Sequence, residues 1–531
     1  MSADEASAAA GQLVQAIEEF LSAHPEAALL EDGRVLFDMR IARYSVAESH
    51  GRCLLQLWSD ERNVVRTVVQ VEHRAQCLRV LTRRMGQTKP QALELVPTAD
   101  RRTPTARDAA RRNYMRLLER ALARTNPGCK IDAMRSAMDL EHSFGPAYAR
   151  GHLLRGTAGE AVIGVGAAES ASTIDGVLTL GLLWLNYCRE HGDARRYFGA
   201  LRVIVPEGAA RTTAERMSWL NHAAAEFRLF TLDERSEELT EVDFRDSGNL
   251  ESTLVHAFSA QAAIARCQQG IDEILALVPD GAEERVEIRT RSTTETALLL
   301  HGLEFARVRA GAAAHSFARQ LEVTFGAGPQ ETPLTEESAP LCRQLFARLF
   351  ASRCPDGAQV DPLFRMQPER WLESRLRMSL GELLPSLRGD LLCSQVPALS
   401  AGDRGMLDLL TLDRAGRLTI IELKADEDLH LPLQALDYWI RVRALQHDRQ
   451  PAEGGGRPLT AFERKGYFQG AEVSELPPRL LLAAPALRIH PANEPVLRYF
   501  APEIDWELIA LTEHWRRELR VVFRKRPGDP R

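Results

Sequence analysis

The chain has 531 residues and a mass of 59.2 kDa, a length for which we expect about three or four domains, each able to bury a core. Apolar residues make up 45% and charged residues 26% of the sequence, which excludes a disordered chain, a collagen-like chain and a coiled-coil rod. The formal net charge of −6 excludes a protein that is basic over its whole surface.

The lysine and cysteine content further limits the class of protein that the sequence can encode. Only five of the 67 basic residues are lysines, so arginine supplies almost every positive charge. The eight cysteines form no C-x-x-C pair and no signal peptide is recognisable, so we expect reduced thiols in a cytoplasmic protein. No apolar run reaches the roughly 18 residues of a membrane-spanning helix, and no membrane contact is expected.

Residues 1–100 are predicted to form a helix followed by a small β-rich unit. Leu13, Ile17 and Leu21 recur at helical spacing in the first 28 residues. The apolar period then changes to two, which predicts short antiparallel strands. The sequence leaves open whether this unit reads a substrate or joins two chains in a homo-oligomer. The predicted strands are 35–37, 53–58, 64–71 and 77–82.

An arginine-rich helix is predicted after the break at 97–104. The stretch Arg101–Arg124 holds eight arginines against the two acids Asp108 and Glu119. Two interpretations are open. The arginines form either a solvated helix face or a face that contacts phosphates.

Alternating strands and helices then predict an α/β module over residues 101–245, with a mixed or parallel sheet. Its expected elements are strand 161–165, helix 174–189, strand 201–205, helix 212–220 and strand 226–232. Residues 246–364 are predicted to be an α+β connecting region of no assignable fold, and 365–531 a further α/β module. In the connecting region we expect helix 247–277, strands 286–291, 297–308 and 320–325, and helix 336–352.

The last module contains a hairpin that carries charged side chains. Two predicted strands, 406–412 and 418–423, are joined by a turn at 413–416. Asp408 lies on the first strand, whereas Glu422 and Lys424 lie on the second and point to the same face. Two carboxylates and an amine on a strand that is otherwise apolar are costly to bury unless they bind something. Hard oxygen ligands suit Mg²⁺ or Mn²⁺.

Two further side chains are expected near this face. Gln434 and Tyr438 are four residues apart on the helix predicted after the hairpin, so they share one side of it. Purely structural interpretations also remain open for the charged residues of the hairpin. Asp408 would then cap a strand end, and Glu422 with Lys424 would form an exposed charge pair.

These residues together resemble the PD-(D/E)XK phosphodiesterase superfamily of restriction-type and DNA-repair nucleases. The matching pieces are Asp408 and Glu422-x-Lys424 on the two strands of the hairpin. Gln434-x-x-x-Tyr438 resembles the Q-x-x-x-Y motif of the RecB-type branch. The resemblance covers residues 365–531, about a third of the chain.

Three further details of the resemblance concern other positions. The segment Gly402–Asp408 is similar to the G-x-x-D-R-x-D segment of the RecB-type branch. The family's proline before the first acid is replaced by Leu407. The helix predicted at 368–380 would carry the family's first acidic residue, for which Glu373 is the candidate.

The resemblance implies hydrolysis of a phosphodiester with one or two Mg²⁺ or Mn²⁺ ions. Asp408, Glu422 and the main-chain carbonyl of Leu423 would hold the metal, and Glu373 would hold a metal-bound water. Lys424 would steer the nucleophile and offset charge on the phosphate. The remaining two candidates, Gln434 and Tyr438, would position the substrate backbone.

The middle module looks like a degenerate copy of the same unit. Residues 201–234 and 480–513 align without a gap and share six identities in 34 positions. In this alignment we expect Gly164 and Gly166 at the positions of Glu422 and Lys424. Asp408 would fall near Gly151-His152, and Glu119 would take the place of Glu373. The copy would therefore keep the fold and lose the metal-binding face, unless the two modules are unrelated.

The sequence thus predicts a cytoplasmic metal-dependent nuclease that acts on nucleic acid, with DNA expected, in repair or defence. The alternative is a catalytically idle nuclease-like protein that binds nucleic acid or serves as a scaffold. No P-loop is present that would indicate a fused motor, and no cysteine follows Cys393 to complete an iron–sulfur cluster.

Overall fold

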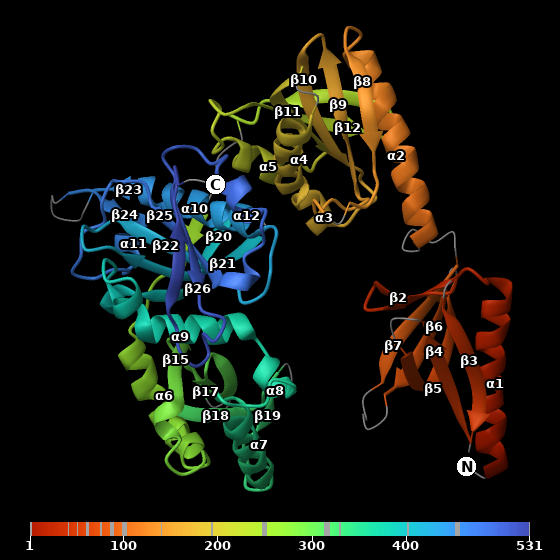
Figure 1. The fold of residues 1–531 in the computed structure, drawn as a ribbon. Helices are drawn as coiled ribbons and strands as arrows, with labels where there is room; N and C mark the ends of the chain where they lie inside the picture. The colour runs from red at the N-terminus through yellow and green to blue at the C-terminus, as the bar shows by residue number, and fades with distance from the viewer. Residues whose placement is uncertain are drawn as a thin grey trace. The chain divides into compact units, whose positions relative to one another are not determined.

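The architecture is that of a computed structural model, drawn in Figure 1. It describes residues 3–529 except for 41, 50, 60–62, 75–76, 85–89, 98–103, 140, 193–194, 247–251, 313–318, 329–330, 401–402 and 452–456. The chain is a mixed α/β protein with several sheets, and it divides into two units. Residues 1–210 with 228–242 form the first unit, and residues 211–227 with 243–531 form the second.

The N-terminal part is a helix on an antiparallel sheet. Burial alternates along its strands, as in the seven residues from Arg52, and the inward positions such as Leu55 and Leu57 pack against Ile17 and Leu21 of the helix. The predicted helix and antiparallel strands are therefore present. The sheet order is β2-β1-β7-β6-β5-β4-β3. The elements are α1 (Ala3–Ala23), β1 (Ala28–Glu31), β2 (Arg34–Asp38), β3 (Arg43–Ser49), β4 (Arg52–Trp58), β5 (Asn63–Arg74), β6 (Cys77–Arg83) and β7 (Gln91–Val96).

The middle part is a six-stranded sheet with helices on it, in the order β13-β12-β11-β10-β9-β8. Leu118 and Leu122 of α2 pack against Val162 and Ile204 of the sheet. The parallel pair β10 and β11 is joined through α4. The elements are α2 (Pro104–Thr125), β8 (Lys130–Arg135), β9 (Tyr148–Arg155), β10 (Ala158–Val165), α3 (Ala171–Asp175), α4 (Val177–His191), β11 (Tyr197–Pro206), α5 (Ala210–Met217), β12 (Glu226–Asp233) and β13 (Glu238–Val242).

The arginine-rich helix is α2, and part of its charge is neutralised within the protein. Arg111 binds Glu169, with 2.6 Å between Nε and Oε1, and Arg120 binds Glu237. Arg101 lies outside the described residues. The structure therefore does not favour the interpretation that all of these arginines form a phosphate-contacting face.

The connecting region forms a third sheet, ordered β15-β16-β17-β18-β19, with α6 and α7 against it. Two predictions fail here. The helix expected at 247–277 is a strand and a shorter helix, because the Ser259 side chain accepts a hydrogen bond from the Ala262 amide and caps the helix at residue 260. The elements are β14 (Ser252–Leu254), α6 (Ala260–Leu275), β15 (Val286–Ser292), β16 (Glu295–Leu300), β17 (Leu303–Ala312), β18 (Arg319–Phe325), β19 (Thr332–Pro333), α7 (Ala339–Ser352) and α8 (Pro362–Arg365).

The strand expected at 297–308 is in fact a hairpin. His301 and Gly302 both have positive φ, 47° and 75°, and they form a two-residue turn that brings Leu300 opposite Leu303. Turns of this kind need positive φ at both central residues. The leucines on either side hid the turn in the sequence.

The C-terminal part is a mixed sheet ordered β14-β20-β21-β22-β25-β26-β27, with β22, β25 and β26 parallel. α9 packs on one face through Trp371 and Leu376, which contact Ile421 and Leu481. The elements are α9 (Pro368–Leu383), β20 (Cys393–Ser400), β21 (Asp403–Leu412), β22 (Leu418–Leu423), α10 (Leu431–His447), β23 (Arg449–Gln450), β24 (Leu459–Thr460), α11 (Ala461–Arg464), β25 (Arg479–Pro485), α12 (Asn493–Leu497), β26 (Asp505–Leu511) and β27 (Val521–Lys525).

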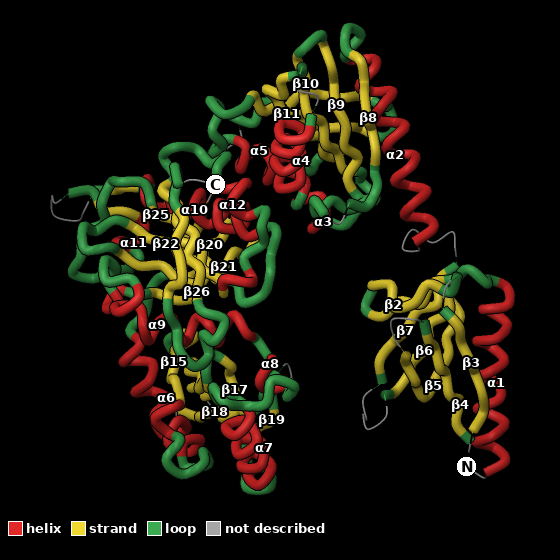
Figure 2. The backbone as a smooth tube through the Cα atoms, viewed as in Figure 1, coloured by secondary structure: helices red, strands yellow, loops and turns green. Residues whose placement is uncertain are grey.

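The middle and C-terminal sheets share one strand order. β8-β9-β10-β11-β12-β13 corresponds to β20-β21-β22-β25-β26-β27. In both, the first two pairings are antiparallel, the third is parallel and the last is antiparallel. Helices also occur at corresponding points, with α2, α4 and α5 matching α9, α10 and α12 in the order that Figure 2 shows. The topology is the one that an internal copy requires.

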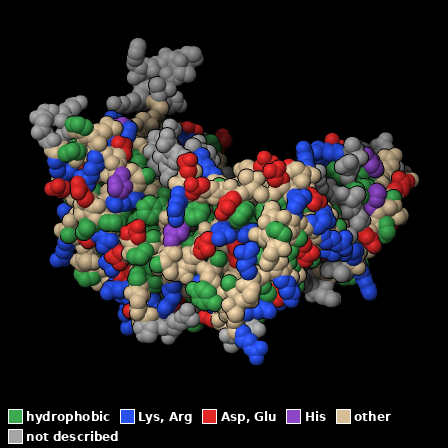
Figure 3. All heavy atoms as spheres, turned by 90° about the horizontal axis from the view of Figure 1, so that it is seen from above, with side chains coloured by type: hydrophobic (Ala, Val, Ile, Leu, Met, Phe, Trp, Pro, Cys, Tyr) green, Lys and Arg blue, Asp and Glu red, His purple; other side chains and the backbone are tan. Residues whose placement is uncertain are grey.

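Surface and helix composition add two observations. No helix in the described part of the chain is both long and apolar enough to cross a membrane. Basic and acidic side chains are interspersed over the face shown in Figure 3. Any binding of a charged ligand must therefore rest on local groups of side chains.

A buried ion pair holds α10 within the second unit. Arg216, 2% exposed, binds both carboxylate oxygens of Asp437 on α10 at 2.8 and 2.7 Å. Beside this pair, the ring of Trp219 packs edge-on against Trp439 at 4.7 Å. The segment 211–227 thus stabilises the helix that carries Gln434 and Tyr438.

We expect Arg216→Ala to destabilise the second unit by on the order of 3 kcal/mol, because it leaves Asp437 poorly solvated and without its cation. The measurement is the Tm of the full chain by scanning calorimetry. Arg211→Ala is the matched control, since Arg211 on the same helix forms an exposed pair with Glu215 at 2.9 Å and should cost less than about 0.5 kcal/mol. Equal shifts for the two variants would contradict the assignment.

Candidate active site

Two predicted acids lie opposite each other where the ladder between β21 and β22 ends. The register pairs Leu409 of β21 with Ile421 of β22, so Asp408 and Glu422 are the next residues on the two strands. Residues opposite each other in an antiparallel pair point to the same face. The Leu423 amide donates a hydrogen bond to Asp408 Oδ2 at 3.1 Å and fixes this carboxylate at the strand end.

Burial makes the two acids difficult to ionise. Glu422 is 4% exposed, and its Oε2 has no hydrogen-bond partner among the described residues. Burial, and then the charge of Asp408, raise the pKa of Glu422 well above its ordinary value. Burial also raises the pKa of Asp408 to about 6, against the hydrogen bond from the Leu423 amide. The two carboxylates are adjacent and repel each other, and one of them has a buried oxygen without a partner. A bound cation would reduce this repulsion.

The donor set fits Mg²⁺ or Mn²⁺. Within the described residues, no three His, Cys, Asp or Glu side chains gather closely enough to hold a metal ion by themselves. The protein ligands would therefore be Asp408, Glu422 and, as the resemblance implies, the carbonyl of Leu423. A small number of carboxylates completed by waters is usual for Mg²⁺.

Lys424 is charged and lies among acids. Its Nζ is 3.5 Å from Asp428 Oδ2 and 3.8 Å from Glu369 Oε1. Burial acts to lower the pKa of Lys424, but the carboxylates around it, Glu369 and Glu422 foremost, outweigh burial and raise it. The ammonium therefore stays protonated at neutral pH beside the acid pair.

The two residues predicted on α10 differ in how closely they approach the acids. Tyr438 is half-buried, and its pKa is raised by burial and then by the charges of Glu422 and Asp408. Gln434 is also half-buried and lies one turn earlier on the same side of α10. No contact between Gln434 and the acids is present.

Glu373 lies beside the acid pair but is already bound. It is 1% exposed, and its oxygens accept hydrogen bonds from Arg289 at 3.0 Å, Arg370 at 3.1 Å and Gln395 at 2.8 Å. Burial still raises its pKa, although the two arginines act to lower it. A role in holding a water must therefore share this carboxylate with two guanidinium groups.

Gln395 is a site residue that the sequence did not reveal. The ladder between β20 and β21 pairs Ser394 with Leu409 and Val396 with Leu407, so Gln395 lies opposite Asp408. Its φ of 54° is unusual for a residue other than glycine. Its amide nitrogen lies 2.8 Å from Glu373 Oε2 and 3.4 Å from Asp408 Oδ1.

Asp408 of the acid pair lines a pocket of about 470 Å³, to which three parts of the second unit contribute. β15 and β17 contribute Arg289 and Glu304, α9 contributes Glu369 and Arg370, and β21 contributes Asp408. Glu369 was also missed, although it precedes Glu373 by one helical turn and therefore shares its side of α9. The complete lining is Arg289, Arg291, Leu299, Gly302, Glu304, Gln367, Pro368, Glu369, Arg370, Asp408 and Asp426.

Comparison with known proteins adds no family. No protein-family model matches this chain, and no curated protein matches it. The chemistry assigned to the site therefore depends on its own side chains and on their arrangement. The part of the predicted motif at Gly402 lies outside the described residues.

The middle sheet corrects two predictions about the degenerate copy. Val162 pairs with Arg202, and Ile421 pairs with Leu481, the residue aligned with Arg202. Ile163 and Val165 therefore correspond to Glu422 and Lys424, and Gly164 and Gly166 do not. The predicted register was one residue off, which in a strand exchanges the two faces.

The counterpart of Asp408 is a buried arginine. Ile163 pairs with Arg150 on β9, so Arg150 replaces Asp408 and the expected Gly151-His152 is wrong. Arg150 is 1% exposed, and its guanidinium lies 4.6 Å from the ring centre of Phe144. A cation thus stands in the middle sheet where the C-terminal sheet has an acid. Glu119, expected to match Glu373, is only half-buried.

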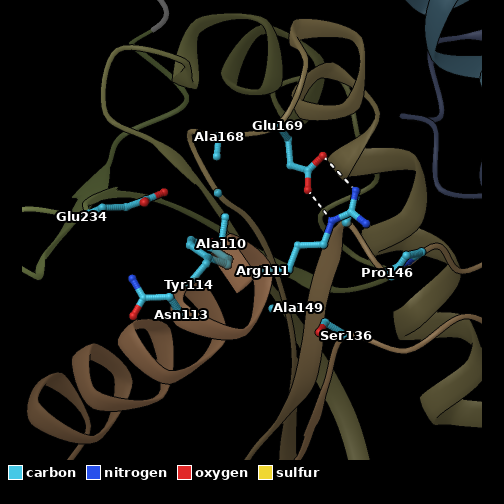
Figure 4. Close-up of a pocket in the computed structure, with 12 residues that line it drawn as sticks. Ala110, Arg111, Asn113, Tyr114, Ser136, Pro146, Ala149, Ala168, Glu169 and Glu234 are labelled. Atoms are coloured by element: carbon cyan, nitrogen blue, oxygen red, sulfur yellow. Dashed lines mark hydrogen bonds and ion pairs between the residues drawn. The ribbon is translucent and has the colours of Figure 1, made fainter. Parts of the chain in front are cut away.

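A smaller pocket lies at the corresponding edge of the middle sheet (Figure 4). Its volume of about 80 Å³ holds a few waters rather than a nucleotide. Arg111 and Glu169 point toward each other at this pocket and are bound to each other. Tyr114 fills the adjoining space, since a Cβ added at Gly164 would lie 2.5 Å from its hydroxyl.

The acid pair predicts an inverted pH dependence for the metal-free protein. The pKa of Asp408 rises on folding from an ordinary value near 3.8 to about 6. The stabilisation from its proton is therefore complete below about pH 4 and is lost as the pH rises through 6. This difference is worth at most roughly 3 kcal/mol.

We expect Glu422→Gln to raise the Tm of the metal-free protein at pH 7.5, because it removes a carboxyl that burial and Asp408 make costly to ionise, and to change it less at pH 4.5. Calorimetry in EDTA makes this comparison, with Glu382→Gln at an exposed position of α9 as control. Mn²⁺ should raise the wild-type Tm more at pH 7.5 than at pH 5.0, and should not raise that of Glu422→Gln. A lower Tm for Glu422→Gln at both pH values would show that the glutamate is structural.

Proposed function

We propose that this protein is a metal-dependent nuclease that hydrolyses phosphodiester bonds of DNA. The observation that carries the proposal is the acid pair of Asp408 and Glu422 beside the charged Lys424, with Asp408 lining a pocket. Arg289, Arg291 and Arg370 also line that pocket, each paired with a glutamate that a phosphate would replace. The hairpin of β21 and β22, which the family resemblance implies, carries both acids.

Each side chain has a distinct part in the proposed reaction. A bound Mg²⁺ or Mn²⁺ would polarise the phosphate and lower the pKa of a water. Asp408, Glu422 and the Leu423 carbonyl would hold that ion. Lys424 offsets the charge that develops on the phosphate oxygens and orients the attacking water. Hydrolysis forms a bond from the water oxygen to phosphorus and breaks the bond to the leaving alcohol, which takes a proton.

The surrounding residues position these groups. Gln395 and the two arginines hold Glu373 close to Asp408, so Glu373 can accept a hydrogen bond from a water without carrying a free charge. Tyr438 would offer its hydroxyl to a phosphate oxygen. Gln434, one turn away on α10, would bind the backbone further along the strand.

One observation favours the alternative of a catalytically idle nuclease-like protein that binds nucleic acid or serves as a scaffold. Glu373 is already bound to Arg289 and Arg370, so the acid expected to assist the metal is not free. An idle site of this kind would bind nucleic acid without cutting it. The same experiment therefore decides between the two functions.

We expect the purified full chain to cleave linear, circular or single-stranded DNA in Mg²⁺ or Mn²⁺ and not in EDTA. Glu422→Gln should reduce the rate by at least about 1000-fold, and Lys424→Ala by about 100-fold or more, because both act on charge in the transition state. Gel assays of single turnovers measure these rates, with Glu382→Gln as the matched control. Calorimetric titration with Mn²⁺ checks metal binding separately from cleavage.

Cleavage that survives Glu422→Gln would show that the site is wrong. Binding of DNA without cleavage of any of the three substrates, with Mn²⁺ bound, would replace the nuclease by the idle binding protein. A rate that falls equally in Glu382→Gln would indicate loss of folding rather than loss of chemistry.

A further inference from the structure

A second pocket adjoins the acid site and is rich in arginine. Its volume is about 410 Å³, and it shares Pro368 and Asp426 with the first pocket, so the two are neighbours. Three arginines, Arg365, Arg488 and Arg516, line it. The complete lining is Gln359, Phe364, Arg365, Pro368, Ala425, Asp426, Pro485, Arg488, Glu513, Trp515 and Arg516.

The three guanidinium groups form no ion pair in the described structure, although the charge of Asp426 acts on Arg516. Arg365 donates from Nε to the Gln359 carbonyl at 2.6 Å, and Arg488 is exposed. Arg516 has a buried Nε with no hydrogen-bond partner among the described residues. Among the described residues, none of these three arginines forms an ion pair with a carboxylate. In the first pocket, by contrast, Arg289 and Arg370 both bind Glu373.

The acids at this pocket leave an excess of positive charge. They are Asp426 and Glu513, against three arginines. Glu513 is partly engaged, since its Oε1 accepts a hydrogen bond from the Leu487 amide at 2.6 Å. An anion in the pocket would therefore meet unpaired guanidinium donors.

The aromatic residues of the pocket do not present a stacking surface. Trp515 is 3% exposed, and the guanidinium of Arg516 lies 4.1 Å from its ring centre. The same guanidinium also covers Phe364, at 4.8 Å. A nucleic-acid base has no free ring to stack on, so the pocket favours a phosphate over a base. Guanidinium groups match phosphate because they donate parallel hydrogen bonds to two of its oxygens.

We propose that this second pocket binds a phosphate group of the nucleic-acid strand whose neighbouring phosphodiester lies at the acid pair. The proposal rests on the proposed nuclease function, since it extends the path of the same strand from Asp408 past Pro368 to Arg488. The phosphate is either a terminal monoester or an internal diester, and both have the same charged oxygens. A terminal monoester would make the enzyme act from strand ends.

The test measures binding rather than cleavage, so that it stands apart from the nuclease assay. The full chain is titrated by fluorescence anisotropy with a labelled single-stranded oligonucleotide that carries or lacks a 5′-phosphate, in EDTA. Arg488→Glu and Arg365→Gln should each raise the Kd by about tenfold, because a charge-assisted contact is lost. Each should also reduce the dependence of log Kd on log salt by about one phosphate contact.

Arg414→Glu is the matched control, because Arg414 is exposed at the turn between β21 and β22, at the other end of that hairpin from Glu422. It carries the same charge change and should alter the Kd less than about twofold. Inorganic phosphate should compete with the oligonucleotide in the wild type and less well in Arg488→Glu. Calorimetry of each variant checks that folding is retained.

The outcomes separate the two phosphate sources and the two proposals. An affinity that depends on the 5′-phosphate in the wild type but not in Arg488→Glu assigns the pocket to a strand terminus. Equal affinity with and without it, and loss in Arg488→Glu, assigns the pocket to an internal phosphate. Equal effects of Arg488→Glu and Arg414→Glu would overturn the inference, even if the nuclease assay succeeds. If Arg488→Glu loses binding and the wild type cleaves no DNA, the inference of a phosphate pocket stands and the nuclease proposal is overturned.

Discussion

The repulsion between two carboxylates held out of water determines the arrangement of the site. Asp408 and Glu422 lie opposite each other on neighbouring strands, where Glu422 is buried and Asp408 is half-buried. The groups around them each reduce the free-energy cost of this repulsion. Lys424 adds a positive charge at the strand end, the Leu423 amide donates to one carboxylate, and the Gln395 amide donates to the other side of Asp408. One oxygen of Glu422 remains without any partner in the described structure, and this is the place where a cation contributes most.

The helix α9 joins two sheets at this point, which gives the connecting region a direct part in the site. Its apolar side packs on the C-terminal sheet, as the position of α9 between the two sheets in Figure 1 shows. On its polar side, Glu373 binds Arg289 and Arg377 binds Glu287, both of which belong to β15. Arg289 binds Glu287 as well as Glu373, so a charge network connects the connecting region to the acid pair. A displacement of β15 would change the position of Glu373 before it disturbed the strands themselves.

The sequence predicted the parts of the site that follow from short-range periodicity. The alternation of a strand places Glu422 and Lys424 on one face, the turn at 413–416 brings Asp408 opposite, and the helical period aligns Gln434 with Tyr438. Three features needed the structure. Arg289 is 84 residues from Glu373, a pairing that no local pattern encodes. Gln395 reaches the acids from a backbone with a φ of 54°, a conformation that the sequence does not signal at a residue other than glycine. The register of the middle copy was one residue off, since similar apolar residues on both faces of β10 gave no means to tell the faces apart.

The replacement of Asp408 by Arg150 in the middle sheet has a consequence for stoichiometry. Among the described residues of the two matching sheets, only the C-terminal one carries the acid pair, because Arg150 and Ile163 occupy the corresponding places in the other. If that pair cuts DNA as proposed, one chain breaks one strand in each encounter. A duplex would then be severed either by two chains that act on opposite strands or by one chain in two successive events, with a nicked intermediate between them.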